Sequence, residues 1–184
     1  MVALCAALAI TYEGAMLTTA ESISQATSRR STIYLPQVAT AAPTFAQQVV
    51  SLINQERTSH GCQPLHVSPQ ISAAAQAHSQ DMALNDFVGH IGSDGSSIGE
   101  RFTRAGYGWR MAAENIAAGQ ATPETVVASW MSSSTHRANI LNCALRDIGV
   151  GYYYQPDDQP NVRLSNGQTG GPFRSYWTQD FGSQ

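Results

Sequence analysis

The spacing of apolar residues changes near Asp147, and this change constrains the fold more than any other feature of the sequence. Before it, apolar residues recur every three or four positions, as on one face of a helix. From Ile148 to Tyr154 every second residue is large and apolar, which predicts a strand with one face turned inward. A second strand is predicted over 175–181, where Trp177 and Phe181 share one face. Helices followed by strands predict an α+β fold in which helices cover an antiparallel sheet.

Four helices are expected before the change in spacing. They begin at or near Phe45, Pro69, Ile98 and Pro123. Ser68 and Thr122 are N-cap residues, each followed by a proline at the first helical position. A weaker apolar pattern indicates a further strand over 111–117. The serines at 132–134 predict a break in the last helix, so that His136 lies at a helix-to-turn junction before a short apolar turn.

The first 42 residues differ in character from the rest of the chain. Residues 1–20 begin with a short apolar run and end in small residues, so we expect a truncated signal peptide, although no Lys or Arg precedes the run. This run is too short to predict a transmembrane helix. Residues 21–42 are rich in Ser, Thr and Ala without a helical or strand period, which predicts a flexible linker. The folded domain is expected over 43–184.

The cysteines indicate the compartment. Cys5 lies in the expected leader, which leaves Cys62 and Cys143 as an even pair. Two such thiols commonly form a disulfide in an oxidising compartment, and we expect that bridge here. The alternative is two buried free thiols. A zinc–cysteine site is not expected, because the chain has neither a third thiol outside the leader nor a C-x-x-C spacing.

The charge of the chain limits its partners. Charged residues make up only 12% of the sequence, the formal net charge is −3, and Lys and Arg form no run. Nucleic-acid binding requires a basic footprint, so we expect no nucleic-acid partner. A polybasic contact with a membrane surface is excluded for the same reason. We expect a monomer that meets an unknown extracellular or envelope ligand.

Three polar residues stand where functional groups concentrate. His90 lies in a Gly- and Ser-rich loop, His136 follows the serine break, and Glu114 stands between apolar residues. Two imidazoles beside a carboxylate can hold a divalent metal such as Zn²⁺ or act as an acid/base pair. His78 lies on the apolar stripe of its helix, so we assign it to the core. The sequence contains no HExxH, GxSxG, P-loop or GxGxxG motif.

Seven short motifs occur in an order that resembles a known family. They are Asn54–Arg57, Ala77–Met82, Gly89–Gly95, Ala113–Ala117, Ser129–Ser133, His136–Leu141 and Tyr176–Phe181. Over roughly 45–182 the chain resembles the CAP superfamily of cysteine-rich secretory proteins, antigen 5 and pathogenesis-related group one proteins (SCP-like domains), in its compact bacterial form. The resemblance implies a three-layer α-β-α sandwich and a secreted, extracellular or cell-envelope location. It also implies a central cavity lined by His90, Glu114 and His136, where some members bind a divalent metal.

One position departs from the pattern of many eukaryotic members. Ser133 stands where they carry a second glutamate, three residues after the tryptophan that corresponds to Trp130. The family's set of two histidines and two glutamates is therefore incomplete. Asp94, four residues after His90, is a candidate for the second acid of the cavity. The alternative for Asp94 is a cap of its turn or of the helix that follows.

Three functions are compatible with these residues. The first is a secreted binding or scaffold domain whose cleft accepts a divalent metal through His90 and His136. The second is a metal-assisted hydrolase of a peptide, cell-wall or ester bond, in which Glu114 is the catalytic general base. The third is a lipid or sterol carrier, for which the sequence offers no Met- or Leu-rich loop. The sequence favours the first function and leaves catalysis open.

Overall fold

A computed structural model describes residues 42–184, and it contains five helices and seven strands in that range. The expected signal peptide, and the expected linker up to residue 41, lie outside the described residues. The helices are α2 (Phe45–Ser59), α3 (Pro69–Leu84), α4 (Ile98–Arg104), α5 (Pro123–Ser132) and α6 (Ser134–Ile140). The strands are β1 (His66–Val67), β2 (Phe87–Val88), β3 (Met111–Ala118), β4 (Asp147–Tyr154), β5 (Val162–Leu164), β6 (Thr169–Gly170) and β7 (Ser175–Ser183).

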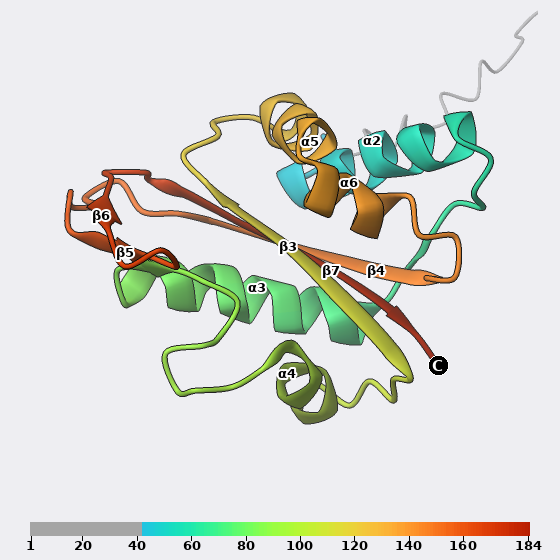
Figure 1. The fold of residues 1–184 in the computed structure, drawn as a ribbon, viewed down its shortest axis with the longest axis horizontal. Helices are drawn as coiled ribbons and strands as arrows, with labels where there is room; N and C mark the ends of the chain where they lie inside the picture. The colour runs from blue at the N-terminus through green and yellow to red at the C-terminus, as the bar shows by residue number, and fades with distance from the viewer. Residues whose placement is uncertain (1–41) are drawn as a thin grey trace, which may run out of the picture. The chain divides into compact units, whose positions relative to one another are not determined.

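The main sheet has the strand order β1-β4-β7-β3. The central strand β7 pairs antiparallel with both β4 and β3, whereas the short β1 runs parallel to β4. Helices α3 and α4 lie on one side of this sheet, and α2, α5 and α6 lie on the other (Figure 1). The predicted α+β sandwich of three layers is therefore confirmed, and the parallel β1 is an addition to it.

Two sequence predictions need correction. The sequence pattern predicts no strand between β4 and β7, but β5 and β6 form an antiparallel pair there and join β2 in a second sheet. Strands of two or three residues are too short to show an apolar period. The region around His136 is helical and not a turn, because Ser133 takes an extended conformation that ends α5 and begins α6.

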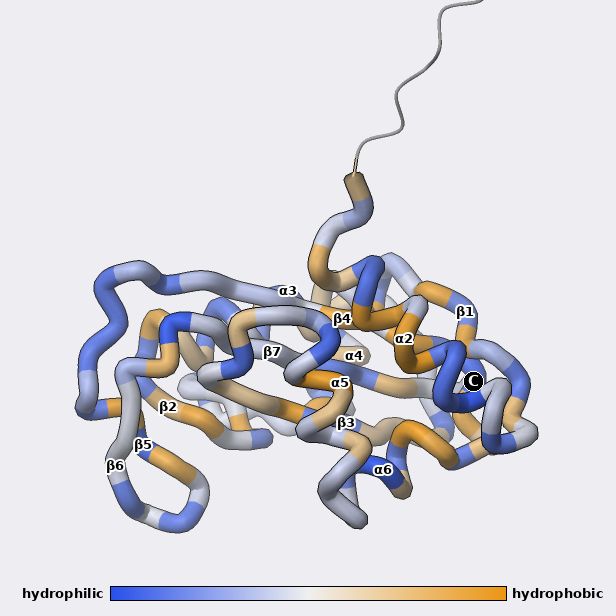
Figure 2. The backbone as a smooth tube through the Cα atoms, turned by 90° about the horizontal axis from the view of Figure 1, so that it is seen from above, coloured by the Kyte–Doolittle hydropathy of each residue, from blue (hydrophilic) through white to orange (hydrophobic). Residues whose placement is uncertain are grey.

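The larger hydrophobic core lies between the main sheet and the layer of α2, α5 and α6. The side chains of Ile148 and Val150 on β4, and of Trp177 and Phe181 on β7, point into it. Trp130 of α5 is buried against them. In Figure 2 hydrophobic and hydrophilic segments alternate along α2, as expected of a helix with one buried face. Burial of such side chains supplies about 1.5–3 kcal/mol each.

The opposite face of the sheet touches α3 through glycine. A Cβ atom added at Gly149 would lie 2.3 Å from the backbone nitrogen of Ser72, and one at Gly151 would lie 2.2 Å from the carbonyl oxygen of Ala75. These distances are far shorter than any van der Waals contact. The backbone of α3 therefore rests directly on β4, and any larger residue at these two positions would push the helix off the sheet.

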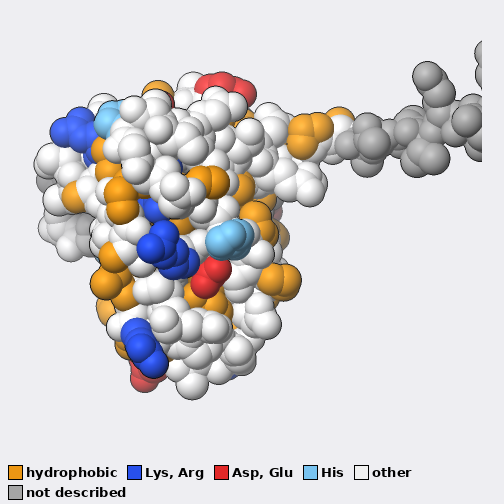
Figure 3. Space-filling model, turned by 90° about the vertical axis from the view of Figure 1, so that its right-hand side faces the viewer, with side chains coloured by type: hydrophobic (Ala, Val, Ile, Leu, Met, Phe, Trp, Pro, Cys, Tyr) orange, Lys and Arg blue, Asp and Glu red, His pale blue; other side chains and the backbone are white. Residues whose placement is uncertain are grey.

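Charged side chains are sparse on the surface. In the space-filling view of Figure 3 few side chains have the colours of charged residues, and the Arg side chains of the described residues appear at separate places on this face. This agrees with the low charged fraction of the sequence, 12%.

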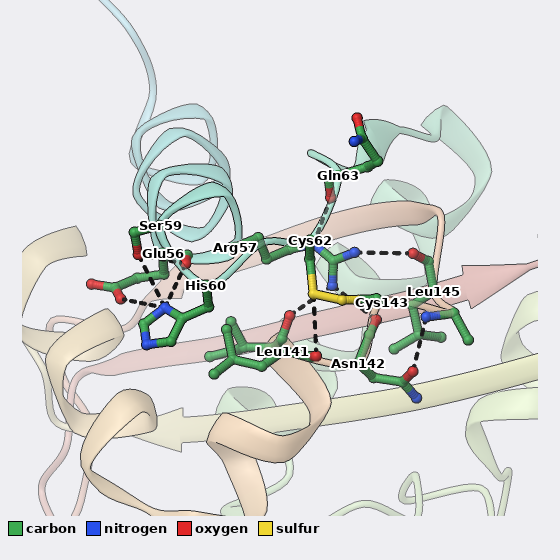
Figure 4. The surroundings of a disulfide bond; sticks show 12 residues. Glu56, Arg57, Ser59, His60, Cys62, Gln63, Leu141, Asn142, Cys143 and Leu145 are labelled. Carbon is green, nitrogen blue, oxygen red and sulfur yellow. Dashed lines mark hydrogen bonds and ion pairs between the residues drawn. A yellow bond between two sulfur atoms is a disulfide. The ribbon is translucent and has the colours of Figure 1, made fainter.

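The predicted disulfide is confirmed between Cys62 and Cys143, which are 81 residues apart (Figure 4). Beside it the buried side chain of Arg57 donates to four backbone carbonyl groups. The acceptors are those of Gln63, Ile140, Asn142 and Leu145, at 2.7–3.1 Å. Bridge and guanidinium together join the end of α2 to the segment that follows α6. Closing a loop of this length contributes about 3–5 kcal/mol.

Candidate functional site

Glu114 is the centre of the candidate site. It lies in the middle of β3, an edge strand of the main sheet, and its side chain is 3% exposed on the face covered by α3 and α4. One carboxylate oxygen, Oε1, is 2.8 Å from Nδ1 of His90. The other, Oε2, is 2.5 Å from Nη2 of Arg101. The sequence prediction that His90 and Glu114 lie together is therefore met by a direct hydrogen bond.

Arg101 is a functional residue that the sequence reasoning missed. It lies in α4 and is 7% exposed, although the short helix shows only an ordinary apolar stripe. Besides Glu114, its guanidinium binds the loop, where Nη1 donates to the carbonyl groups of His90 at 3.1 Å and Ser96 at 3.0 Å. Arg101 thus fixes the carboxylate and the loop that carries His90 with one side chain. An arginine among the apolar positions of a short helix was the available signal.

These partners determine the charge of Glu114. Burial alone would raise the pKa of this carboxyl, but the hydrogen bond from His90 and then the positive charge of Arg101 outweigh burial and hold the pKa below its ordinary value. Glu114 is therefore an anion with a donor on each oxygen. Donors on both oxygens oppose the uptake of a further proton by this carboxylate.

His90 is the exposed member of the pair, with a side chain that is 55% exposed. Its Nδ1 is occupied by Glu114, and in an imidazole ring Nε2 then lies on the side away from that carboxylate. A histidine held by a carboxylate in this way presents its second nitrogen in a fixed direction. The arrangement suits a ligand or metal that approaches from solvent.

His136 approaches the site from the other side of the edge strand. Its backbone carbonyl accepts a hydrogen bond from Nδ2 of Asn115, the residue after Glu114, at 3.1 Å. Asn139, one turn further on in α6, donates to the carbonyl of Glu114 at 3.2 Å and to Oδ1 of Asn115 at 2.9 Å. Burial, and then the electrostatic influence of His90, lower the pKa of His136.

The neighbours of His136 hold α6 in place through contacts of their own. Asn139 joins α6 to β3, as described above, and Arg137 donates from Nη1 to the carbonyl of Met131 at 3.1 Å. Ser133, at the position of the missing second glutamate, places its hydroxyl 3.1 Å from that of Thr135. A hydroxyl at this position supplies no second negative charge to the site.

Asp94 has partners of its own. Its Oδ1 accepts from the backbone nitrogen of Ser96 at 2.9 Å, and its Oδ2 pairs with Arg104 at 2.9 Å. Hydrogen bonds from Ser96 and Arg104 lower the pKa of Asp94. These contacts are those of a residue that stabilises its turn. Asp94 lines a hollow of about 350 Å³ between α3, the loop and α4, together with His78 and Arg101, and its role as a second acid stays a prediction.

His78 belongs to the core, as the sequence predicts. Its side chain is fully buried, and Nε2 lies 2.9 Å from the carbonyl oxygen of Gly89, to which it donates. Burial lowers the pKa of His78, although the nearby Glu114 partly opposes this. The neutral ring joins α3 to the residue before His90 and so supports the loop from beneath.

A model of the cysteine-rich secretory protein family, CAP, matches residues 50–181. The match covers well over half of the chain, so the chain belongs to this family, and the resemblance seen in the motifs is confirmed.

Two curated relatives are bacterial. The chain is 41% identical over 117 residues to the uncharacterized protein YkwD of Bacillus subtilis, and this match covers 61% of this chain and 46% of that protein. It is 30% identical over 116 residues to the uncharacterized membrane protein YlbC of the same organism, covering 61% of this chain and 34% of that one. The chain therefore spans less than half the length of these relatives.

Solved structures agree with the fold. An extracellular protein containing a SCP domain from Bacillus anthracis has a TM-score of 0.61 and 27% identity, and the match covers 76% of this chain and 40% of that one. An outer surface protein from Borrelia burgdorferi has a TM-score of 0.59 and 16% identity, with 74% of this chain and 90% of that one covered. The second likeness supports the fold alone.

Two features of residues 42–184 bear on the possible partners of the chain. No helix there is long and apolar enough to cross a bilayer. No group of three or more His, Cys, Asp or Glu side chains there could enclose a metal ion. Of the site residues in this range, His90 and His136 offer two ring nitrogens, so any bound metal would keep water or an external ligand in its remaining positions.

Proposed function

We propose that this domain is a secreted binding domain in which His90 and His136 together accept a divalent metal ion, and that it is not a hydrolase with Glu114 as its base. The observation that carries the proposal is the 2.8 Å contact between Nδ1 of His90 and Oε1 of Glu114. Carboxylate–histidine pairs of this kind orient metal-binding histidines in many proteins. With only two protein ligands, binding is weaker than at a structural zinc site.

The state of Glu114 favours binding over hydrolysis. A metal-assisted hydrolase requires a carboxylate that can take a proton from water. Here both oxygens of Glu114 have donors, the side chain is 3% exposed, and its pKa lies below the ordinary value. When bound, a divalent ion at the two imidazoles would offer its open positions to oxygen or nitrogen atoms of a ligand. Glu114 then acts through His90 as a positioning residue.

Two findings support an extracellular or envelope location. The Cys62–Cys143 disulfide suits an oxidising compartment. The Bacillus anthracis protein that shares the fold at 27% identity is described as extracellular.

The test is calorimetric titration of the whole chain with Zn²⁺. We expect one site in the wild type and its loss in His90→Ala and in His136→Ala. His66→Ala is the matched control, because His66 is exposed and lies in β1, and it should bind as the wild type does. Equal binding in all four proteins, or none in the wild type, would refute the metal site.

Glu114→Gln separates binding from hydrolysis. Gln keeps the size of the side chain but removes the negative charge that fixes His90, so we expect Zn²⁺ affinity to fall about 10–100-fold. A screen with peptide, cell-wall and ester substrates should find no turnover in the wild type at saturating Zn²⁺. Turnover that is present in the wild type and absent in Glu114→Gln would establish the hydrolase instead.

A further inference from the structure

Asp180 is a buried carboxyl group that the proposed function does not use. It lies on β7 and is paired in register with Glu114 on β3, so the two side chains share the face covered by α3 and α4. Asp180 is completely buried. Among residues 42–184, no N–H or O–H group donates to either of its oxygens. An ionised carboxylate without donors is unstable in such a place.

The hydrogen-bonded nitrogens of Arg101 serve groups other than Asp180, and its buried Nε has no hydrogen-bond partner among residues 42–184. Nη2 of Arg101 binds Glu114 and its Nη1 binds two backbone carbonyl groups. On β4 the residue opposite Asp180 is Gly149, which has no side chain. Further along the same face, the Tyr107 hydroxyl donates to Asp147 at 2.6 Å. Arg101 thus supplies the one guanidinium beside the two carboxyl groups of Glu114 and Asp180 among residues 42–184.

His78 is the remaining candidate for a counterion, and its geometry opposes this role. Its Nε2 carries the proton that is donated to Gly89, and burial lowers the pKa of the ring. The carboxylate within 4.0 Å of His78 is Glu114, at 3.9 Å. A neutral His78 leaves Asp180 without a positive partner.

We propose that Asp180 is a neutral carboxylic acid at neutral pH and that its O–H donates to the carboxylate of Glu114. Because Glu114 and Asp180 are directly opposite each other on neighbouring antiparallel strands, their Cβ atoms are about 4.5–5.5 Å apart and the two carboxyl groups are neighbours on one face. Glu114 then accepts from three donors, namely Asp180, Arg101 and His90, and the buried group of two carboxyls and one guanidinium has no net charge. Asp180 is a positioning residue, because it acts on His90 only through Glu114.

The electrostatic environment supports this assignment. Burial, followed by the negative charge of Glu114 and the hydrogen bond with it, raises the pKa of Asp180 well above the ordinary value of 3.8. The same bond helps to keep the pKa of Glu114 low. When two neighbouring carboxyl groups share a proton, the pKa of one is commonly raised and that of the other lowered. The assignment concerns the proposed metal site but does not depend on metal binding.

The direct test is carbon-13 NMR of the side-chain carboxyl groups in the wild-type chain at pH 7 without metal. We expect the Cγ signal of Asp180 at the position of a protonated acid. Asp158 provides the internal carboxylate reference, because it is also buried but accepts from the backbone nitrogens of Phe173 and Arg174 and from the Tyr176 hydroxyl. A carboxylate signal for Asp180, or nitrogen-15 shifts that show both nitrogens of His78 protonated, would overturn the proposal.

A second measurement compares the wild type with Asp180→Asn, which keeps the shape and an N–H donor but needs no proton. In the wild type the native state holds a proton that the unfolded chain releases above pH 3.8. The unfolding constant of the wild type, divided by that of Asp180→Asn, should therefore rise by up to about tenfold per pH unit above pH 3.8. A constant ratio would contradict the proposal. Neither experiment contains Zn²⁺, so its outcome is separate from that of the titration above.

Discussion

The two faces of the main sheet are held by different forces. On the face covered by α2, α5 and α6, large apolar side chains such as Trp130, Trp177 and Phe181 fill the space between the layers. On the face covered by α3 and α4, glycines of β4 admit the helix backbone, and beside them lies a buried polar group around Glu114. The first face depends on buried area, whereas the second depends on close fit and on a balance of charges.

This difference explains the position of the candidate site. Strand β3 is at the edge of the main sheet. Its consecutive side chains point to opposite faces of the sheet, and both faces are close to solvent at this edge. Glu114 enters the polar face and binds His90, and Asn115 enters the other face and binds the backbone of His136. One strand thereby places two histidines from distant parts of the chain.

The largest expected effect tests the close fit of the polar face. In Gly151→Ala the new methyl group would lie 2.2 Å from the carbonyl oxygen of Ala75 in α3. Because the obstacle is backbone, we expect a loss of about 3 kcal/mol or more in the free energy of unfolding. Gly108→Ala is the control, since nothing lies within 4 Å of an added Cβ there, and its cost should stay within about 0.5 kcal/mol. Equal costs in urea unfolding would refute the tight contact.

The second prediction concerns acid. The pKa of His78 is lowered from 6.5 in the native state, so the unfolded chain binds a proton below pH 6.5 that the native state does not. Stability from this residue is complete above pH 6.5 and falls with the pH below it, by up to about 1.4 kcal/mol per pH unit. Urea unfolding of wild type and His78→Gln at pH 7 and pH 5 should show the larger loss in the wild type. Identical losses would mean that His78 does not remain neutral.

The smallest expected effect is on the apolar face. Ile148→Val removes one buried methylene-sized group from the large core, which should cost about 0.5–1.5 kcal/mol. Since no charge is involved, this cost should be the same at pH 5 and pH 7. A cost that changes with pH would show that the two faces are not independent.

The same contrast explains what the sequence could predict. The apolar face follows from periodicity, because the inward residues of β4 and β7 are large and alternate with others. The helix starts at Ser68 and Thr122 follow from local capping chemistry, and both residues cap their helices as expected. The even number of cysteines outside the expected leader predicted the Cys62–Cys143 disulfide. These features depend on neighbours along the chain.

The polar face depends on partners that are distant in the sequence. Arg101 is an ordinary residue of a short helix until Glu114 meets it, and Asp180 stands in β7 between a glutamine and a core phenylalanine. Gly149 and Gly151 weaken a strand pattern although the fold requires them. The pairing of His90 with Glu114 was predicted only because the order of the motifs resembled a family.

The most direct test of the account is the tautomer of His90. If the Glu114 anion fixes this ring, the neutral imidazole carries its proton on Nδ1 and leaves Nε2 free for a ligand. Long-range proton–nitrogen NMR spectra of the wild-type chain without metal, recorded where the ring is neutral, distinguish the two nitrogens. We predict the Nδ1–H form. A ring with its proton on Nε2 would contradict both the role of Glu114 and the metal site built on it.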